Sequence, residues 1–182
     1  SRGKGRGREV IAAARSADVI LLVVDIFNPN ISVLMKELYN AAIRLNQRRP
    51  DVVITTASQG GINVMPTLKL TKITTETIAD MTAAYGHINA TVVVREDIDV
   101  EQMLDVLAGN RVYIKCVMAI NKVDLAKPGQ LEAVQEMHKA YITVPVSAAT
   151  GLGITDLKQT LYDTIEMIRI YLKPQGQEAD MD

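Results

Sequence analysis

Short apolar runs that end at a polar residue alternate along this chain with segments whose apolar residues recur at helical spacing. Runs of this length, rich in β-branched residues, favour strands buried in a sheet. The first run, at 19–24, is continuous and predicts a central parallel strand covered on both faces. Alternation of strands and helices predicts an α/β protein with a wound sheet. We expect strands at 19–24, 113–120 and 142–146, and helices at 9–15, 34–45, 130–139 and 154–166.

The middle of the chain, residues 47–112, has a different pattern. Strand-like runs at 52–56 and 62–65 flank a glycine-containing turn, so they predict a β-hairpin. Thr74 or Thr75 is placed to cap a helix that extends to about residue 84. A further strand is expected at 90–94, and a helix over 100–107 that Gly109-Asn110 would end. We therefore expect a small α+β unit inserted between two parts of the wound sheet.

The chain begins S-R-G-K-G-R-G-R, and its three glycines predict a flexible loop over residues 1–8. The stretch does not match the phosphate-loop pattern G-x-x-x-x-G-K-[ST], because neither Ser nor Thr follows Lys4. Two interpretations of its four basic side chains stay open. They could hold RNA phosphates, or they could simply be solvated.

Composition narrows the class of protein but does not identify it. Hydrophobic residues make up 48% and charged residues 23% of the 182 residues, as is typical of globular proteins. The net charge of −1 gives no sign of nucleic-acid binding by the chain as a whole. The single cysteine, Cys116, lies in an apolar run and is expected to be a buried, inert thiol. With no membrane-length apolar run and no signal-peptide core, we expect a cytoplasmic protein.

The run that ends at Ile120 is followed by Asn121-Lys122-Val123-Asp124, a tetrapeptide of the form N-K-x-D. Open α/β sheets bind ligands just past the carboxyl ends of their strands. Guanine presents two adjacent donors, N1–H and the 2-amino group, and the Asp124 carboxylate could accept both. Asn121 would contact the base and brace the neighbouring loop, while the Lys122 stem could lie along the base plane. The alternative is a polar turn whose sequence matches by chance.

A second stretch, Ser147-Ala148-Ala149, follows the expected strand at 142–146. In the context of Asp124, the backbone N–H of Ala148 could donate to O6 of guanine. The alternative is an ordinary strand-to-helix turn capped by Ser147. Asp25, at the end of the first apolar run, is interpreted as a structural residue.

Several stretches together resemble the Obg superfamily of GTPases, and within it the branch of developmentally regulated GTP-binding proteins. The Obg resemblance is carried by G-K-G-R-G-R-E-V at 3–10 and by the strand that ends at Asp25. The narrower one is carried by G-G-I-N at 60–63, G-N-R-V-Y-I at 109–114 and I-R-I-Y-L-K-P at 168–174.

This resemblance implies a partial P-loop GTPase-type wound sheet interrupted by a small inserted α+β domain. It assigns guanine specificity to Asn121, Lys122 and Asp124, and the following loop to Ser147 and Ala148. It further implies binding of GTP or GDP with Mg²⁺, association with the ribosome and a role in translation. The implied segments are 1–46 (end of the second switch, then a strand and helix of the G domain), 47–112 (an insert resembling a ribosomal-protein fold), 113–167 (the rest of the G domain) and 168–182 (the start of a TGS domain).

The family's phosphate loop, first switch and D-x-P-G magnesium motif would all lie before residue 1. No catalytic residue or metal ligand is therefore assigned, and this chain alone is expected neither to bind GTP tightly nor to hydrolyse it. A non-enzymatic module that binds RNA or the ribosome is the alternative function. A wound sheet without its first strands would expose an edge and an apolar face, which predicts dimerisation or exchange of elements.

Overall fold

A computed structural model describes residues 3–166 of the chain, with side chains from residue 9 onward. The chain divides into two compact units. Unit 1 combines Ser1–Met35 with Ile114–Asp182, and unit 2 is Lys36–Tyr113. The strand expected at 168–172 and the segment 168–182 lie outside the described residues.

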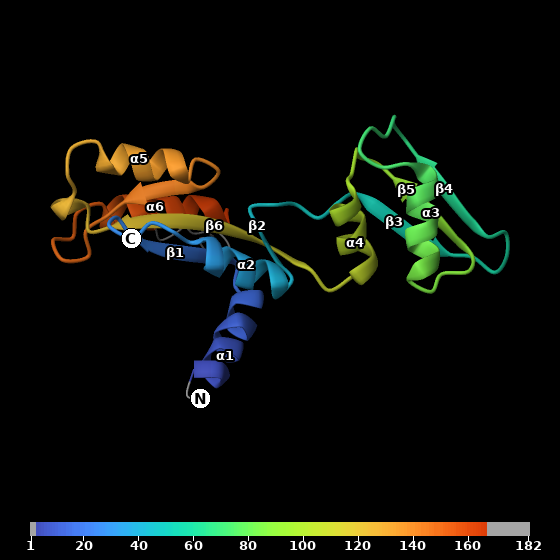
Figure 1. The fold of residues 1–182 in the computed structure, drawn as a ribbon, viewed down its shortest axis with the longest axis horizontal. Helices are drawn as coiled ribbons and strands as arrows, with labels where there is room; N and C mark the ends of the chain where they lie inside the picture. The colour runs from blue at the N-terminus through green and yellow to red at the C-terminus, as the bar shows by residue number, and fades with distance from the viewer. Residues whose placement is uncertain (1–2, 167–182) are drawn as a thin grey trace, which may run out of the picture. The chain divides into compact units, whose positions relative to one another are not determined.

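Unit 1 is built on parallel strands, as its apolar runs predict (Figure 1). The strand β6 pairs in parallel with β1 and also with β7. Successive side chains of β6 point to opposite faces. Val117 and Ala119 pack with Leu157 on one face, and Ile120 packs with Val134 on the other. The elements are α1 (Gly3–Arg15), β1 (Val19–Asp25), α2 (Ser32–Asn40), β6 (Val112–Asn121), α5 (Gln130–Met137), β7 (Ile142–Pro145) and α6 (Ile154–Ile165), and the end of α2 and the first two residues of β6 belong to unit 2.

The first strand differs from its prediction, because only one face of β1 is covered. Leu22 and Val24 are buried, whereas the alternate residues Leu21 and Val23 are 37% and 64% exposed. An apolar run shows which faces a strand can bury but not which neighbours are present to bury them. The prediction that both faces are covered is therefore wrong for the described residues.

Two helix boundaries also differ from the sequence expectations. The helix α1 includes Gly3 and the residues after it, where a flexible loop was predicted. Each helical glycine costs about 1 kcal/mol relative to alanine, which weakens a helix without forbidding it, and the adjoining Arg, Lys and Ala residues favour one. The prediction of a helix over 34–45 is wrong at its end, because α2 stops at Asn40. Ala42 adopts a positive φ of 62°. The chain then pairs with β6 through β2 (Ile43–Leu45), so sheet pairing overrides the helical period.

Unit 2 holds a three-stranded sheet in the order β3-β5-β4, with two helices (Figure 1). Its first two strands do not pair with each other, because β5 lies between them, antiparallel to β3 and parallel to β4. The predicted hairpin is therefore wrong. Val92 and Val94 of β5 are fully buried, which explains why β5 is central. The elements are β3 (Val52–Thr56), β4 (Ile62–Pro66), α3 (Thr75–Ala84), β5 (Ala90–Val94) and α4 (Val100–Ala108).

The helices α3 and α4 begin and end as the sequence predicts. The Thr74 side chain accepts a hydrogen bond from the backbone N–H of Thr77 and caps α3. Asp99 and Gln102 form a reciprocal capping box at the start of α4. Gly109, with φ of 64°, ends α4 in the left-handed conformation that glycine adopts without strain.

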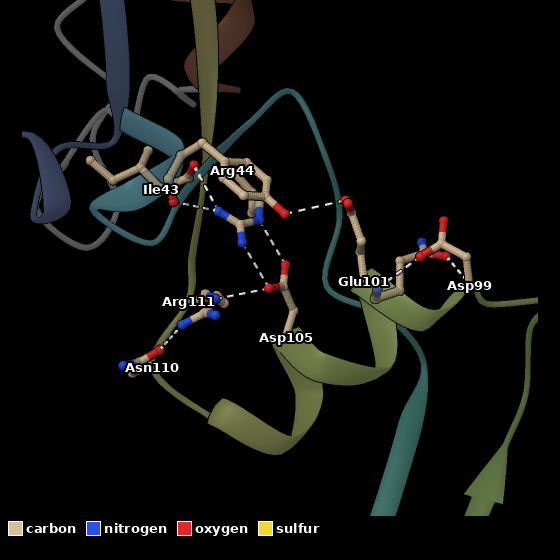
Figure 2. Close-up of polar contacts among 9 residues, drawn as sticks. Ile43, Arg44, Asp99, Glu101, Asp105, Asn110 and Arg111 are labelled. Atoms are coloured by element: carbon tan, nitrogen blue, oxygen red, sulfur yellow. Dashed lines mark hydrogen bonds and ion pairs between the residues drawn. The ribbon is translucent and has the colours of Figure 1, made fainter. Parts of the chain in front are cut away.

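A buried ionic cluster joins β2 to α4 within unit 2 (Figure 2). The Arg44 guanidinium donates two hydrogen bonds to the Asp105 carboxylate, at 2.7 and 2.8 Å, and Arg111 donates a third at 2.8 Å. The Arg44 and Asp105 side chains are only 3% and 9% exposed. The centroid of the Tyr39 ring lies 3.7 Å from the Arg44 guanidinium carbon, and the Tyr39 hydroxyl donates a hydrogen bond to Glu101. We call Arg44, Asp105 and Arg111 the Asp105 cluster.

No helix in the described part of the chain is both long and apolar enough to cross a membrane.

The substitution Asp105→Ala should lower the free energy of unfolding of unit 2 by about 3–5 kcal/mol, because it leaves the Arg44 charge buried and unpaired. Urea denaturation measures this loss. The matched control is Glu101→Ala on the same helix, which removes an exposed partner and should cost about 1 kcal/mol or less. Equal small losses in both variants would contradict a stabilising role for the cluster.

Candidate functional site

Three parallel strands of unit 1 end at the same edge of the sheet, and the predicted site residues lie at or just past the ends of two of them. Asp25, the last residue of β1, is in register with Asn121, the last residue of β6. Backbone pairing continues past the strand ends. The N–H of Ile26 donates to the carbonyl of Asn121, and that of Val146 donates to the carbonyl of Ile120. The carboxyl edge of an open α/β sheet is where ligands bind.

Asn121 connects the two predicted motifs. Its side-chain oxygen accepts a hydrogen bond from the backbone N–H of Lys122 at 2.8 Å and another from Ala148 at 3.0 Å. The structure therefore brings the N-K-x-D turn and the Ser147–Ala149 loop together through one amide side chain. This is the bracing role that the sequence analysis expects of Asn121.

The Ala148 amide differs from the expectation, because in this conformation it donates to Asn121. The next amide, that of Ala149, has no hydrogen-bond acceptor among the described residues. The loop thus presents one satisfied and one free N–H group. Both alanines are exposed.

The turn after β6 is tight and leaves its carboxylate exposed. Lys122 adopts a left-handed conformation, with φ of 67° and ψ of 31°. A short 3₁₀ turn over Val123–Leu125 follows and carries Asp124. Within the described residues, the exposed Asp124 carboxylate has no hydrogen-bond or ion-pair partner. Its two oxygens can therefore accept a pair of donors from a ligand.

Sequence reasoning missed the part that Asp25 has in this arrangement. Its Oδ2 lies 2.6 Å from the Lys122 ammonium, and its Oδ1 accepts a hydrogen bond from the backbone N–H of Phe27 at 3.0 Å. The Lys122 contact, followed by the Phe27 amide, holds the pKa of the Asp25 carboxyl below its ordinary value. The available signal was its position at the end of a parallel strand, the same position that Asn121 has.

The loop after β7 is fixed by Ser147, whose side chain is fully buried. Its Oγ accepts from the backbone N–H of Thr150, and its own N–H donates to the carbonyl of Leu152. Gly153 allows the following close approach. It has φ of 72°, and a Cβ atom there would lie 2.1 Å from the carbonyl oxygen of Pro145. Gly153 therefore shapes the entry into α6.

Two titratable groups of unit 1, Cys116 and His138, are buried away from solvent. Cys116 is fully buried, as the sequence predicts, and burial raises the pKa of its thiol to about 11, which disfavours the reactive thiolate. His138, to which the sequence analysis gave no role, is buried and lies 2.8 Å from the carbonyl oxygen of Pro29. In the described part of the chain, no group of three His, Cys, Asp or Glu side chains could hold a metal ion.

An exposed carboxylate and one free backbone N–H group thus lie at the carboxyl edge of an α/β sheet, the edge at which such sheets bind nucleotides and other ligands. Residues 59–167 match the family described as the C-terminal region of the MMR_HSR1 domain. A GTP-binding protein of Methanocaldococcus jannaschii is 49% identical to this chain, over 100% of this chain and 47% of the relative.

Two further relatives carry the name developmentally regulated GTP-binding protein. Protein 1 of Xenopus laevis is 36% identical over 98% of this chain and 48% of its own length, and protein 2 of Homo sapiens is 35% identical over 99% and 49%. The chain belongs to the family of GTP-binding proteins that these relatives represent, which confirms the narrower resemblance, to developmentally regulated GTP-binding proteins. It spans about half the length of the curated relatives it matches.

The substitution Gly153→Ala should destabilise unit 1 by about 1–3 kcal/mol or more, because the added Cβ atom would overlap the backbone of Pro145. It should also shift the amide NMR signals of Ala148 and Ala149. The control is Gly151→Ala, which has a similar φ of 83° but open space around the added atom. This control should show only the backbone strain of about 1 kcal/mol. Equal effects in the two variants would show that the close approach has no importance.

Proposed function

We propose that unit 1 carries the guanine-recognition part of a GTP-binding protein. The observation that carries this proposal is the Asn121 side chain, which joins the N-K-x-D turn to the Ser147–Ala149 loop while Asp124 stays exposed and unpaired beside them. The names of the relatives support GTP as the nucleotide.

Asp124 is the residue that distinguishes guanine from adenine. Its carboxylate accepts the guanine N1–H and one hydrogen of the 2-amino group at once. Adenine has no proton on N1 and no 2-amino group, so it would leave the desolvated carboxylate without donors. Unpaired buried polar groups are costly, which is why a site of this kind rejects the wrong base strongly.

The remaining residues complete the contact with the base. The turn formed by Ser147, Ala148 and Ala149 supplies backbone N–H donors for O6, and the Ala149 amide is free to take this role. The Lys122 stem lies along one face of the base, with its ammonium group at the polar edge. Asn121 acts mainly by holding the two loops at a fixed separation.

In the full-length protein, Asp124→Asn should weaken GTP binding about 10-fold or more and favour xanthosine triphosphate, because an amide can donate to the second xanthine carbonyl. Competition titrations with the two nucleotides measure the change. Asp156→Asn, which neutralises an exposed carboxylate in the first turn of α6, should leave both affinities unchanged. Unaltered GTP affinity in Asp124→Asn would refute the assignment.

We extend the proposal to the whole protein on the resemblance of the sequence. It binds GTP or GDP with Mg²⁺, acts in the cytoplasm, and associates with ribosomes during translation. The sheet of unit 1 belongs to a P-loop GTPase-type fold, and residues 47–112, within unit 2, form the inserted α+β domain. The near balance of acidic and basic residues in unit 2 does not favour RNA binding by that unit alone.

The isolated 182-residue chain should bind GTP negligibly, because phosphate contacts from backbone amides and a lysine supply much of the energy of nucleotide binding. Calorimetry tests this, and micromolar affinity would contradict it.

The exposed Leu21 and Val23 on β1 should promote association with a further chain. Light scattering on the same sample should therefore show more than a monodisperse monomer.

A further inference from the structure

We propose that Asp25 is a positioning residue of the guanine site, which holds the Lys122 side chain in place before the nucleotide binds. This inference rests on the proposed function. It adds a residue from β1 to a site otherwise built from the segments that follow β6 and β7.

The backbone places the two side chains next to each other. Asp25 and Asn121 are register partners in the parallel pair β1–β6, so Lys122 follows directly on the partner of Asp25. Lys122 turns into the left-handed region at φ of 67°. Its ammonium nitrogen lies 2.6 Å from Asp25 Oδ2, a contact between residues 97 positions apart in the sequence.

Asp25 is itself held rigidly, which distinguishes it from an ordinary surface partner. Its second carboxylate oxygen accepts the backbone N–H of Phe27 at 3.0 Å, and its carbonyl accepts the N–H of Asn28 at 2.9 Å. The residue after it donates to the carbonyl of Asn121. One oxygen of the carboxylate is thus fixed by the turn that ends β1, which leaves the other oxygen aimed at Lys122.

A fixed anion changes what Lys122 can do. A lysine stem has four rotatable bonds and loses much conformational freedom when a ligand immobilises it. Because the ammonium group is already bonded to Asp25, part of this ordering is complete before the base arrives. Preorganisation of this kind increases affinity without adding a contact to the ligand. It does not alter which base is read, since Asp25 does not touch the base-reading carboxylate of Asp124.

The test measures GDP affinity of the full-length protein in Asp25→Asn, Lys122→Met and the double variant. Asp25→Asn keeps an oxygen for the Phe27 amide but removes the charge. It should weaken GDP binding about 2- to 5-fold, as expected for loss of an exposed ion pair. The double variant should bind no more weakly than Lys122→Met, because both substitutions remove the same interaction. Asp25→Glu should restore part of the affinity.

The matched control is Glu136→Gln, which breaks another exposed lysine–carboxylate pair of unit 1, that of Lys139 with Glu136 at 2.6 Å. It should leave GDP affinity unchanged. A second measurement does not depend on nucleotide binding. In ¹⁵N-detected spectra of the free protein, the hydrogens of the Lys122 ammonium group should exchange slowly with water, and this exchange should become faster in Asp25→Asn.

The results separate this inference from the proposed function. If Asp124→Asn changes the base preference but Asp25→Asn binds GDP as tightly as the unsubstituted protein, the positioning role is wrong and the guanine site remains. Tighter binding in Asp25→Asn would also overturn the inference, because Asp25 would then compete with the ligand for Lys122. If Asp124→Asn has no effect on base preference, the proposed function itself fails.

Discussion

The strand β6 pairs in parallel with β1 and with β7, and the register of these pairs determines which side chains meet at the carboxyl edge. The central part of β6 is buried, so its register is set by apolar packing on both of its faces. A shift of one residue would exchange those faces and move Asn121 away from Asp25. The polar residues of the site therefore depend on an apolar interaction that none of them makes.

In unit 2, buried charged groups as well as apolar packing determine how the strands and helices are held together. Its apolar cluster joins β3, β4 and β5 to α3 and α4, while the Asp105 cluster joins β2 to α4. Two guanidinium groups donate three hydrogen bonds to one carboxylate, which satisfies a group that would otherwise be costly to bury. The apolar contacts are non-directional, whereas the paired guanidinium and carboxylate groups require one geometry.

Features with a local signal could be predicted from the sequence, whereas those that join distant segments could not. Some signals lie within a few residues of the helix end or strand that they specify. These are the caps at Thr74 and Gly109 and the apolar runs of β5, β6 and β7. Nothing near Gly60 and Gly61 indicates that a third strand will separate the two strands they connect. The pairing of Arg44 with Asp105 and of Asp25 with Lys122 joins distant segments, so it follows from topology and not from spacing. The N-K-x-D turn and the Ser147–Ala149 loop could be expected to lie together only because parallel strands end at one edge.

The role of each residue in the site follows from which of its hydrogen-bond donors and acceptors are not already bonded within the protein. Asn121 uses its side-chain oxygen on two backbone amides, so both acceptor positions of that oxygen go to holding the loops. Asp25 uses both carboxylate oxygens in the same way, on Lys122 and on Phe27. Asp124 and the Ala149 amide are left unpaired among the described residues, one as an acceptor and the other as a donor. Guanine needs acceptors for N1–H and the 2-amino group and a donor for O6. The unpaired groups thus match the base in kind, and the paired ones keep them in position.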